Sequence, residues 1–252
     1  MSEPILHLVL GATGLGKTRL SVALARVYDG CAVLVLDRIQ CYPELAIGSA
    51  RPTSDTLRGT TRLYLDDRPL SPHGPIAAVP GIDRLLLHLR QCLEDGTRAL
   101  VIEGGSISLL HEFLARPGWC SGWDLRVTAY TEQSLAAYEL AVGERVERML
   151  GCRIRRGEVR TLLDELADLW DDPLARKHAA GVLGYEQAID LCELNGLNPR
   201  ELIEPAGLLW RGELTALIRA AHLAYGRQQR HALAAAWPIL TALTESAELC
   251  EI

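Results

Sequence analysis

Residues Gly11–Thr18, which read GATGLGKT, match the pattern GxxxxGK[ST] of phosphate-binding loops. Glycines at this spacing let the backbone turn tightly, so that successive N–H groups of the loop point inward at phosphate oxygens. Lys17 adds a mobile positive charge, and Thr18 offers a hydroxyl group to Mg²⁺. The pattern predicts a phosphate site, but it does not indicate which phosphate compound is held or which bond breaks.

A second candidate is Asp37, a carboxylate that follows the apolar run Ala32–Leu36. Ligands of open α/β sheets collect at the C-terminal ends of the strands, so we expect Asp37 to face the same crevice as the phosphate loop. There it would bind Mg²⁺ or accept a proton from a nucleophile. The alternative is a structural role as the cap of the following turn.

The elements that would position these residues are those of an α/β protein in the first half of the chain. Apolar runs predict buried strands over 5–10, 32–36 and 99–103, a weaker strand over 124–130 and an edge strand near 63–65. Helical spacing covers 18–28 and 82–95, and polar loops fill 41–81. The second half shows helical spacing over 132–150, 158–170, 175–195 and 208–236.

We therefore predict an α/β fold with a P-loop NTPase-like parallel sheet flanked by helices over residues 1–131. A mainly helical domain over 132–252 would complete the substrate site. The tail beyond Thr241 carries no clear pattern.

Composition excludes several classes of protein. The 252 residues carry 26 basic and 32 acidic side chains, a net charge of −6, which argues against a basic nucleic-acid face. The apolar runs are far shorter than the roughly 20 residues of a membrane span. The seven cysteines form no CxxC pair, which argues against a disulfide framework or zinc ribbon. We expect a cytoplasmic protein with small-molecule substrates, no nucleic-acid or membrane partner, and a monomeric or weakly homo-oligomeric state.

Three further blocks are more specific than the phosphate loop. They are Asp37–Pro52 (DRIQCYPELAIGSARP), Arg62–Leu70 (RLYLDDRPL) and Glu103–Leu110 (EGGSISLL). With the phosphate loop, and in this order, they resemble the bacterial adenylate dimethylallyltransferases, or isopentenyltransferases. That family reads roughly GPTxxGKT, LDRxQxxPxxxxGSxRP, RxYLDxRPL and EGGSxSLL. The resemblance is close from about residue 5 to residue 110 and continues more weakly to about residue 227.

The resemblance implies an activity. Family members transfer a dimethylallyl group from dimethylallyl diphosphate to the N6 amine of an adenine nucleotide and release diphosphate, as the first step of cytokinin synthesis. The phosphate loop would then hold the leaving diphosphate together with Mg²⁺ as cofactor, through Gly14, Gly16, Lys17 and Thr18, with Thr18 on the ion. Thr13 matches the threonine that reaches the bridging oxygen of the leaving group, and Asp37 matches the general base.

The resemblance also suggests binding residues. Ser49 and Ser106 match residues around the adenylate, and Arg38 and Arg51 are candidate partners of its phosphate. Arg145 aligns with a helical arginine that grips the prenyl diphosphate. Each arginine has a plainer interpretation as a solvated surface charge. A basic cluster at Arg153, Arg155 and Arg156 has an open register.

Two features depart from the family pattern. The family often has a Tyr and a His three residues apart on a late helix, both near the diphosphate, whereas this chain has His222 and Tyr225 in the opposite order. We expect them to share that role. Leu183 stands where agrobacterial members carry an Asp before a Gly-Tyr pair. We hypothesise that it favours a plain dimethylallyl tail over a hydroxylated one, whose hydroxyl would lose its partner.

Three alternatives remain open. A tRNA dimethylallyltransferase uses related chemistry, but it usually reads DSxQxY where this chain has Asp37–Tyr42, and it suits a net charge of −6 poorly. A small-molecule P-loop kinase would explain Asp37 but not the Arg62–Leu70 block. A nucleotide-binding switch would use the phosphate loop without reacting.

Overall fold

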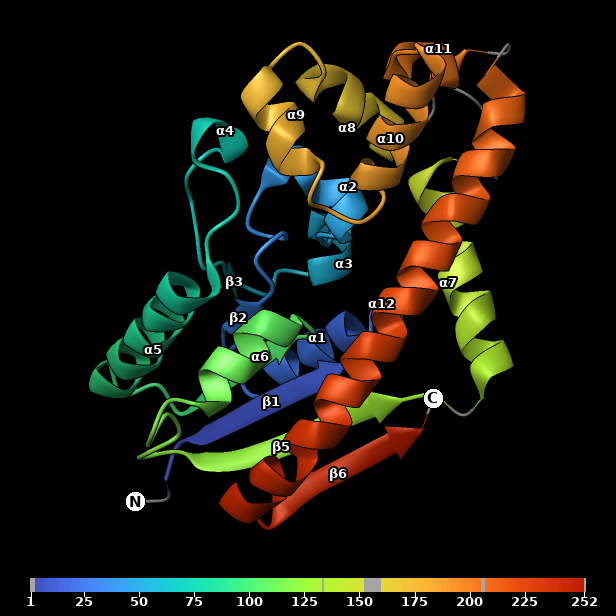
Figure 1. The fold of residues 1–252 in the computed structure, drawn as a ribbon. Coiled ribbons are helices and arrows are strands. Elements are labelled where there is room, and N and C mark those ends of the chain that lie inside the picture. Colours follow the sequence, from blue (N-terminus) through green and yellow to red (C-terminus); the bar gives the residue numbers. More distant parts are fainter. Residues whose placement is uncertain (1–2, 133, 152–159, 205–206, 252) are drawn as a thin grey trace.

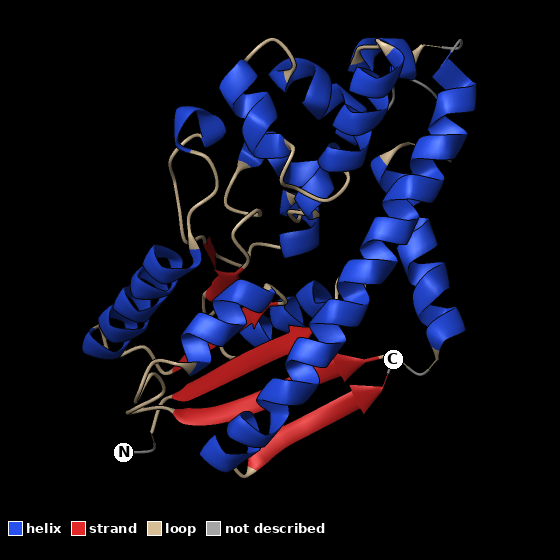
Figure 2. Ribbon diagram, in the orientation of Figure 1, coloured by secondary structure: helices blue, strands red, loops and turns tan. Residues whose placement is uncertain are grey.

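The structure is a computed structural model that describes residues 3–132, 134–151, 160–204 and 207–251. Within this part of the chain the strands form one parallel sheet in the order β3-β2-β4-β1-β5-β6. Figure 2 shows the strands in red, with helices around them. They are β1 (Ile5–Gly11), β2 (Val33–Leu36), β3 (Arg62–Leu63), β4 (Ala99–Gly104), β5 (Asp124–Thr131) and β6 (Ser246–Glu251). Because β1 lies between β4 and β5, the loop that follows it emerges at the middle of the C-terminal edge of the sheet, where β2 also ends.

The strands expected in the first half are confirmed, with β3 as a short edge strand beside β2. The strand β6 was not expected, because its side chains are mostly exposed and it lacks an apolar run. It pairs with β5 and forms the other edge of the sheet.

The two faces of the sheet are covered by different helices. Alternate side chains of a strand point to opposite faces. Val9, Val33 and Val101 pack on one face with side chains of α1 (Lys17–Val27). Leu8 and Leu10 belong to the large core, to which α6 (Ile107–Leu114) and α12 (Leu208–Leu243) contribute. The helix α5 (Ala78–Glu94) packs beside α6.

The segment between β2 and α5, expected to be polar loops, holds several short helices. They are η1 (Pro43–Leu45), α2 (Ala46–Ser49), α3 (Ser54–Leu57) and α4 (Leu70–His73). The helix α5 begins earlier than expected, at Ala78, because a proline such as Pro80 is tolerated in the first turn, where its missing N–H has no helical partner.

A group of helices lies beyond the C-terminal edge of the sheet (Figure 1). They are α7 (Leu135–Met149), α8 (Leu162–Leu169), α9 (Pro173–Ala179), α10 (Tyr185–Asn195) and α11 (Pro199–Ile203). The expectation of one helix over 175–195 is wrong, since α9 ends at Ala179 and α10 starts at Tyr185. Gly184 adopts φ of +92° there, and a side chain at this position would collide with Leu162.

The longest helix, α12, has 36 residues and therefore spans roughly 54 Å. Figure 1 shows it running from the helical group across the sheet, after which the chain returns as β6. The boundary near residue 131 stays a prediction, and α12 and β6 connect the two predicted parts because both contact β5. None of the helices in the described residues has the length and apolar character needed to cross a membrane.

Candidate active site

The phosphate loop forms an open cradle between β1 and α1. Gly14 and Gly16 adopt φ of +95° and +76°, which other residues rarely reach, so the loop can take this path only with glycine at these positions. The Lys17 ammonium donates a hydrogen bond of 2.8 Å to the Ala12 carbonyl oxygen. Gly14, Gly16, Lys17 and Thr18 line a hollow of about 170 Å³, which we call the phosphate hollow.

Burial lowers the pKa of Lys17 to about 8, although the nearby carboxylates of Glu103 and Asp37 act in the opposite direction. A phosphate group in the hollow would raise this pKa again. Lys17 is therefore best suited to a ligand that brings its own negative charge.

Thr18 and Glu103 both line the phosphate hollow. The Thr18 hydroxyl donates a 2.7 Å hydrogen bond to Glu103, whose other oxygen forms a 2.8 Å ion pair with Arg62. Both partners of this ion pair are almost fully buried. Among the described residues no group of three or more His, Cys, Asp or Glu side chains could hold a metal ion. One hydroxyl and one carboxylate nevertheless fit Mg²⁺, which keeps several waters and takes other ligands from substrate phosphates.

Asp37 follows β2, and its two oxygens lie in different surroundings. Its Oδ1 atom accepts hydrogen bonds from the backbone N–H groups of Ile39 at 2.8 Å and Gln40 at 3.2 Å. This is the capping role considered as the alternative. Its Oδ2 atom makes no hydrogen bond within the described residues and so has a free lone pair. Burial raises the pKa of Asp37, while the N–H groups and the charges of Lys17 and Arg145 oppose that rise.

A second, larger cavity of about 340 Å³ adjoins the phosphate hollow, and we call it the mixed cavity. Its walls combine apolar and polar side chains: Thr13, Asp37, Arg38, Ile39, Gly48, Ser49, Ser106, Ser108, Arg145, Gly181, Val182, Leu183, His222, Tyr225 and Gln229. Five of these residues also line the phosphate hollow, namely Thr13, Asp37, Ser49, Arg145 and Gln229. The boundary between the two spaces therefore carries both the predicted base, Asp37, and the cationic side chain of Arg145.

Arg145 comes from α7 and reaches this boundary from the helical side. Its Nη2 atom donates a 3.0 Å hydrogen bond to the Gly48 carbonyl oxygen, and its buried Nε atom has no partner among the described residues. Burial lowers the pKa of Arg145 to about 10, and the Asp37 charge opposes this change. The guanidinium remains charged at neutral pH and can still bind an anion.

His222 and Tyr225 lie on one face of α12 and line the mixed cavity, not the phosphate hollow. His222 is 4% exposed, and neither ring nitrogen has a partner in the described chain. Burial and then the Arg145 charge lower the pKa of His222 to about 3. His222 is therefore neutral at physiological pH and offers a hydrogen bond rather than a positive charge.

The predicted adenylate residues separate into two groups. Arg38, Ser49 and Ser106 line the mixed cavity. Arg51 lines neither space: its guanidinium donates 2.8 Å hydrogen bonds to the Gln40 and Cys41 carbonyl oxygens and stacks 3.9 Å from the centre of the Tyr64 ring. The arginines at 153, 155 and 156 fall outside the described residues.

The sequence did not point to Gln229. Its Oε1 atom accepts the Thr13 N–H at 2.9 Å, and its Nε2 atom donates to the Gly105 carbonyl oxygen at 2.7 Å. Gln229 thus joins the phosphate loop to the end of β4. Gln229 lies four residues after Tyr225 and seven after His222, a spacing that places all three on one helix face. This spacing is the sequence feature that could have indicated Gln229.

A buried network between α8, α10 and α2 was also missed. The Glu165 carboxylate accepts the Ile47 N–H at 3.1 Å and the Tyr185 hydroxyl hydrogen bond, and burial raises the pKa of Glu165. The Tyr185 hydroxyl in turn accepts the Gly48 N–H at 3.2 Å. These contacts fix the segment that presents Ser49.

Comparisons with known proteins found related sequences. Residues 4–242 match the family model described as "Isopentenyl transferase". The chain is 37% identical to the adenylate dimethylallyltransferase of Agrobacterium vitis over 227 residues, which cover 90% of each chain. It is 34% identical to that of Agrobacterium tumefaciens (strain Ach5) over 224 residues, or 89% of this chain and 90% of the relative.

Solved structures of tRNA-modifying enzymes have the same fold. The tRNA delta(2)-isopentenylpyrophosphate transferase of Staphylococcus epidermidis aligns with a TM-score of 0.69 at 16% identity, covering 99% of this chain and 93% of that chain. A eukaryotic dimethylallyltransferase acting on tRNA aligns with a TM-score of 0.67 at 11% identity, covering 99% and 74%. Identities this low show a shared fold alone.

Proposed function

Because this chain belongs to the isopentenyl transferase family, we propose that it is an adenylate dimethylallyltransferase. It moves a dimethylallyl group from dimethylallyl diphosphate to the N6 amine of AMP, or of ADP or ATP, and releases diphosphate. The single observation that carries this proposal is the position of Asp37 on the wall shared by the phosphate hollow and the mixed cavity. A base is needed at that boundary, where a diphosphate from one side meets an acceptor from the other.

In the proposed reaction, the bond between the allylic carbon and the diphosphate oxygen breaks, and its electron pair leaves with diphosphate. The N6 lone pair forms the new bond to that carbon. The N6 amine is a poor nucleophile because its lone pair is delocalised into the purine ring. Transfer of its proton to Asp37 Oδ2 as it attacks restores nucleophilicity. The raised pKa of Asp37 makes it a stronger base than an exposed aspartate.

The diphosphate end of the donor would lie in the phosphate hollow. Negative charge grows on the leaving group as the bond breaks, so Lys17, Arg145 and the loop N–H groups stabilise the transition state more than the ground state. Thr13 would donate its hydroxyl to the bridging oxygen. Mg²⁺, which when bound neutralises part of the diphosphate charge, would be held by Thr18 and, directly or through water, by Glu103.

The nucleotide would enter the mixed cavity, with Arg38 as the candidate partner of its phosphate and Ser49 and Ser106 beside the adenosine. Arg38 uses one Nη atom on the Ile76 carbonyl oxygen, and its other donors make no hydrogen bond within the described residues. Arg51 supports this site indirectly, through the loop carbonyl groups that it binds.

The prenyl tail would pack against the apolar wall of the mixed cavity at Ile39, Val182 and Leu183. An aliphatic wall suits an unsubstituted dimethylallyl group, because a hydroxyl on the tail would lose its hydrogen bond to water on entering. His222 and Tyr225 line the same cavity as neutral side chains with polar atoms.

The curated relatives favour a free nucleotide over tRNA as the acceptor, because their names specify adenylate. A phosphoryl-transferring kinase and a non-reacting nucleotide switch both conflict with membership of a prenyltransferase family. The product would be the prenylated nucleotide that begins cytokinin biosynthesis, and we propose a cytoplasmic location for the reaction.

One experiment separates these functions. The protein is incubated with Mg²⁺, dimethylallyl diphosphate and AMP, and the nucleotide is examined by mass spectrometry for one added prenyl group. A tRNA enzyme would give no product without RNA, a kinase would transfer phosphate from ATP, and a switch would bind without turnover. Omission of Mg²⁺, or its replacement by EDTA, tests the proposed metal requirement in the same assay.

A further inference from the structure

The Arg62–Leu70 block runs alongside the segment Asp37–Pro52, which we call the nucleotide loop. Four residues of the block contact this loop: Arg62 donates to Gln40 Oε1 at 3.4 Å, the Tyr64 ring lies 3.9 Å from the Arg51 guanidinium, Asp66 accepts a hydrogen bond from the Tyr42 hydroxyl, and the Leu70 N–H donates to Glu44 at 3.1 Å. The block therefore contacts the nucleotide loop at several points along its length.

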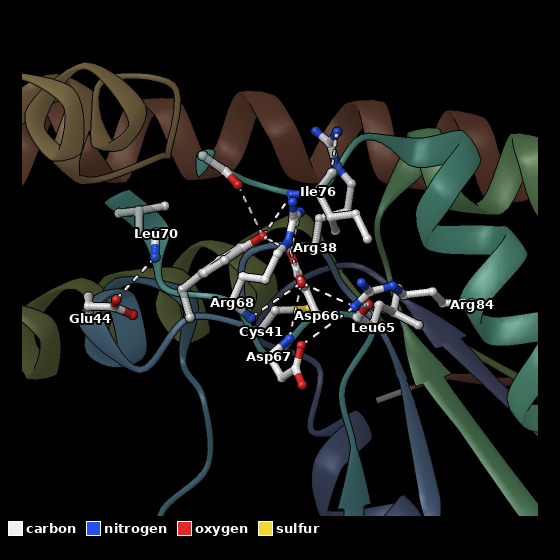
Figure 3. Close-up of polar contacts among 12 residues, drawn as sticks. Arg38, Cys41, Glu44, Leu65, Asp66, Asp67, Arg68, Leu70, Ile76 and Arg84 are labelled. Atoms are coloured by element: carbon white, nitrogen blue, oxygen red, sulfur yellow. Dashed lines mark hydrogen bonds and ion pairs between the residues drawn. The ribbon is translucent and has the colours of Figure 1, made fainter. Parts of the chain in front are cut away.

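Asp66 lies at the centre of these polar contacts (Figure 3). Its carboxylate is buried and accepts two hydrogen bonds from the Arg68 guanidinium at 2.8 and 2.9 Å, and one from Arg84 at 3.1 Å. It also accepts a 2.7 Å hydrogen bond from the Tyr42 hydroxyl. Burial alone would raise the pKa of Asp66, but the bonds from Arg68 and Tyr42 hold it well below its usual range. Asp66 is a fixed, permanently charged acceptor.

A chain of hydrogen bonds leads from Asp66 to the mixed cavity. The Tyr42 hydroxyl, which donates to Asp66, accepts the Ile76 N–H at 2.8 Å. The Ile76 carbonyl oxygen accepts a 3.2 Å hydrogen bond from Arg38 Nη1, and Figure 3 shows Arg38 beside Ile76. Tyr42 is fully buried, so its hydroxyl has no access to water that could replace these partners. Asp66 is thus linked to the Arg38 guanidinium through Tyr42 and Ile76.

We propose that Asp66 is a positioning residue for the acceptor nucleotide, which acts through Tyr42 and Ile76 to hold Arg38 toward the nucleotide phosphate. This inference rests on the proposed function, because it assumes that Arg38 faces the phosphate of an adenylate. It gives the Arg62–Leu70 block a role in substrate selection although none of its residues lines either cavity. The donor diphosphate lies in the other hollow and is not reached by this chain of bonds.

The test compares two ligands on the full-length protein. Tyr42→Phe removes the hydroxyl that joins Asp66 to Ile76 and keeps the buried ring. Calorimetry measures the Kd of AMP and, separately, the Kd of inorganic diphosphate with Mg²⁺. We expect the Kd of AMP to rise about five- to tenfold, as for loss of one or two hydrogen bonds, and that of diphosphate to change less than twofold. Asp66→Asn should show the same selectivity if it folds.

Tyr28→Phe is the matched control. Its hydroxyl is hydrogen-bonded to His7 at 2.9 Å and lies outside both cavities, so this variant should leave both Kd values unchanged. A second control tests the route: Arg38→Ala should weaken AMP binding, and Tyr42→Phe added to it should weaken binding no further than twofold.

Equal losses for AMP and diphosphate in Tyr42→Phe, or an undiminished effect of Tyr42→Phe in the Arg38→Ala background, would overturn the proposal. Unchanged AMP binding in Tyr42→Phe would also overturn it. If the wild-type protein binds AMP but makes no prenylated product, the proposed function fails, whereas the binding comparison still decides the role of Asp66.

Discussion

Gln229 offers the sharpest test of how α12 supports the phosphate loop. Replacement by Leu keeps most of the side-chain volume and removes both hydrogen bonds of the amide. The Thr13 N–H and the Gly105 carbonyl oxygen, now bonded at 2.9 and 2.7 Å, would then lack protein partners.

The expected cost follows from these two groups. An unsatisfied buried polar group costs about 1–3 kcal/mol. Because both groups border the hollows, water can partly replace the amide, and we expect a total loss of about 2–3 kcal/mol in the free energy of unfolding. Thr13 would also lose its fixed position, and displacement of a reacting group by about 1 Å can cost on the order of 100-fold in rate. We expect kcat to fall at least tenfold.

The assay combines urea unfolding with steady-state kinetics at saturating AMP. Gln228→Leu is the control, because Gln228 precedes Gln229 on α12 and its exposed side chain makes no hydrogen bond within the described residues. It should stay within about 0.5 kcal/mol of the wild type. If Gln229→Leu unfolds at the same urea concentration as Gln228→Leu and keeps the wild-type kcat, then Gln229 does not hold the loop and this reasoning is refuted.

Three further predictions concern the base, the loop and the tail. Asp37→Asn should lower kcat by about 10²–10⁴-fold without weakening the binding of diphosphate, and normal turnover by the variant would remove Asp37 from the mechanism. In the wild type, the acid limb of the rate profile should lie above the pKa of an ordinary aspartate, because the raised pKa of Asp37 keeps the base protonated to higher pH. Gly48→Ala should destabilise the protein by about 1–3 kcal/mol in thermal or urea unfolding, because its Cβ atom would overlap the Tyr185 ring, and an unchanged midpoint would contradict this packing. In direct competition, the wild type should prefer dimethylallyl diphosphate to a hydroxylated donor, and Leu183→Asp should reduce that preference. A strong wild-type preference for the hydroxylated donor would contradict the assignment of the apolar wall.

Features that depend on local residue types could be predicted from the sequence. The spacing of Gly14, Gly16, Lys17 and Thr18 specifies a backbone path and a helix start, and the structure has both. Asp37 was recognisable because it ends an apolar run, and strand ends meet at one edge of a parallel sheet. The strands β1, β2 and β4 were equally clear, since buried parallel strands are continuous apolar runs.

Features that depend on distant contacts could not be predicted. Gln229 and Thr13 are 216 positions apart, and no local pattern marks an amide that will meet a loop N–H. Arg51 carried the same sequence signal as Arg38, and only the tertiary position of Tyr64 and the loop carbonyl groups separates their roles. β6 is an exposed edge strand and lacks the apolar signal of the others.

The shared wall between the two hollows has a thermodynamic consequence. A diphosphate bound beside Lys17 and Arg145 would offset the positive charge that now lowers the proton affinity of Asp37. Binding of the donor would therefore strengthen the base before the acceptor reacts. The two anionic ligands would also repel each other across this wall, and linkage requires each to weaken the other by the same factor. Once the bond between the allylic carbon and the diphosphate has broken, diphosphate and the product nucleotide still repel each other. This repulsion favours dissociation of the product that binds less tightly.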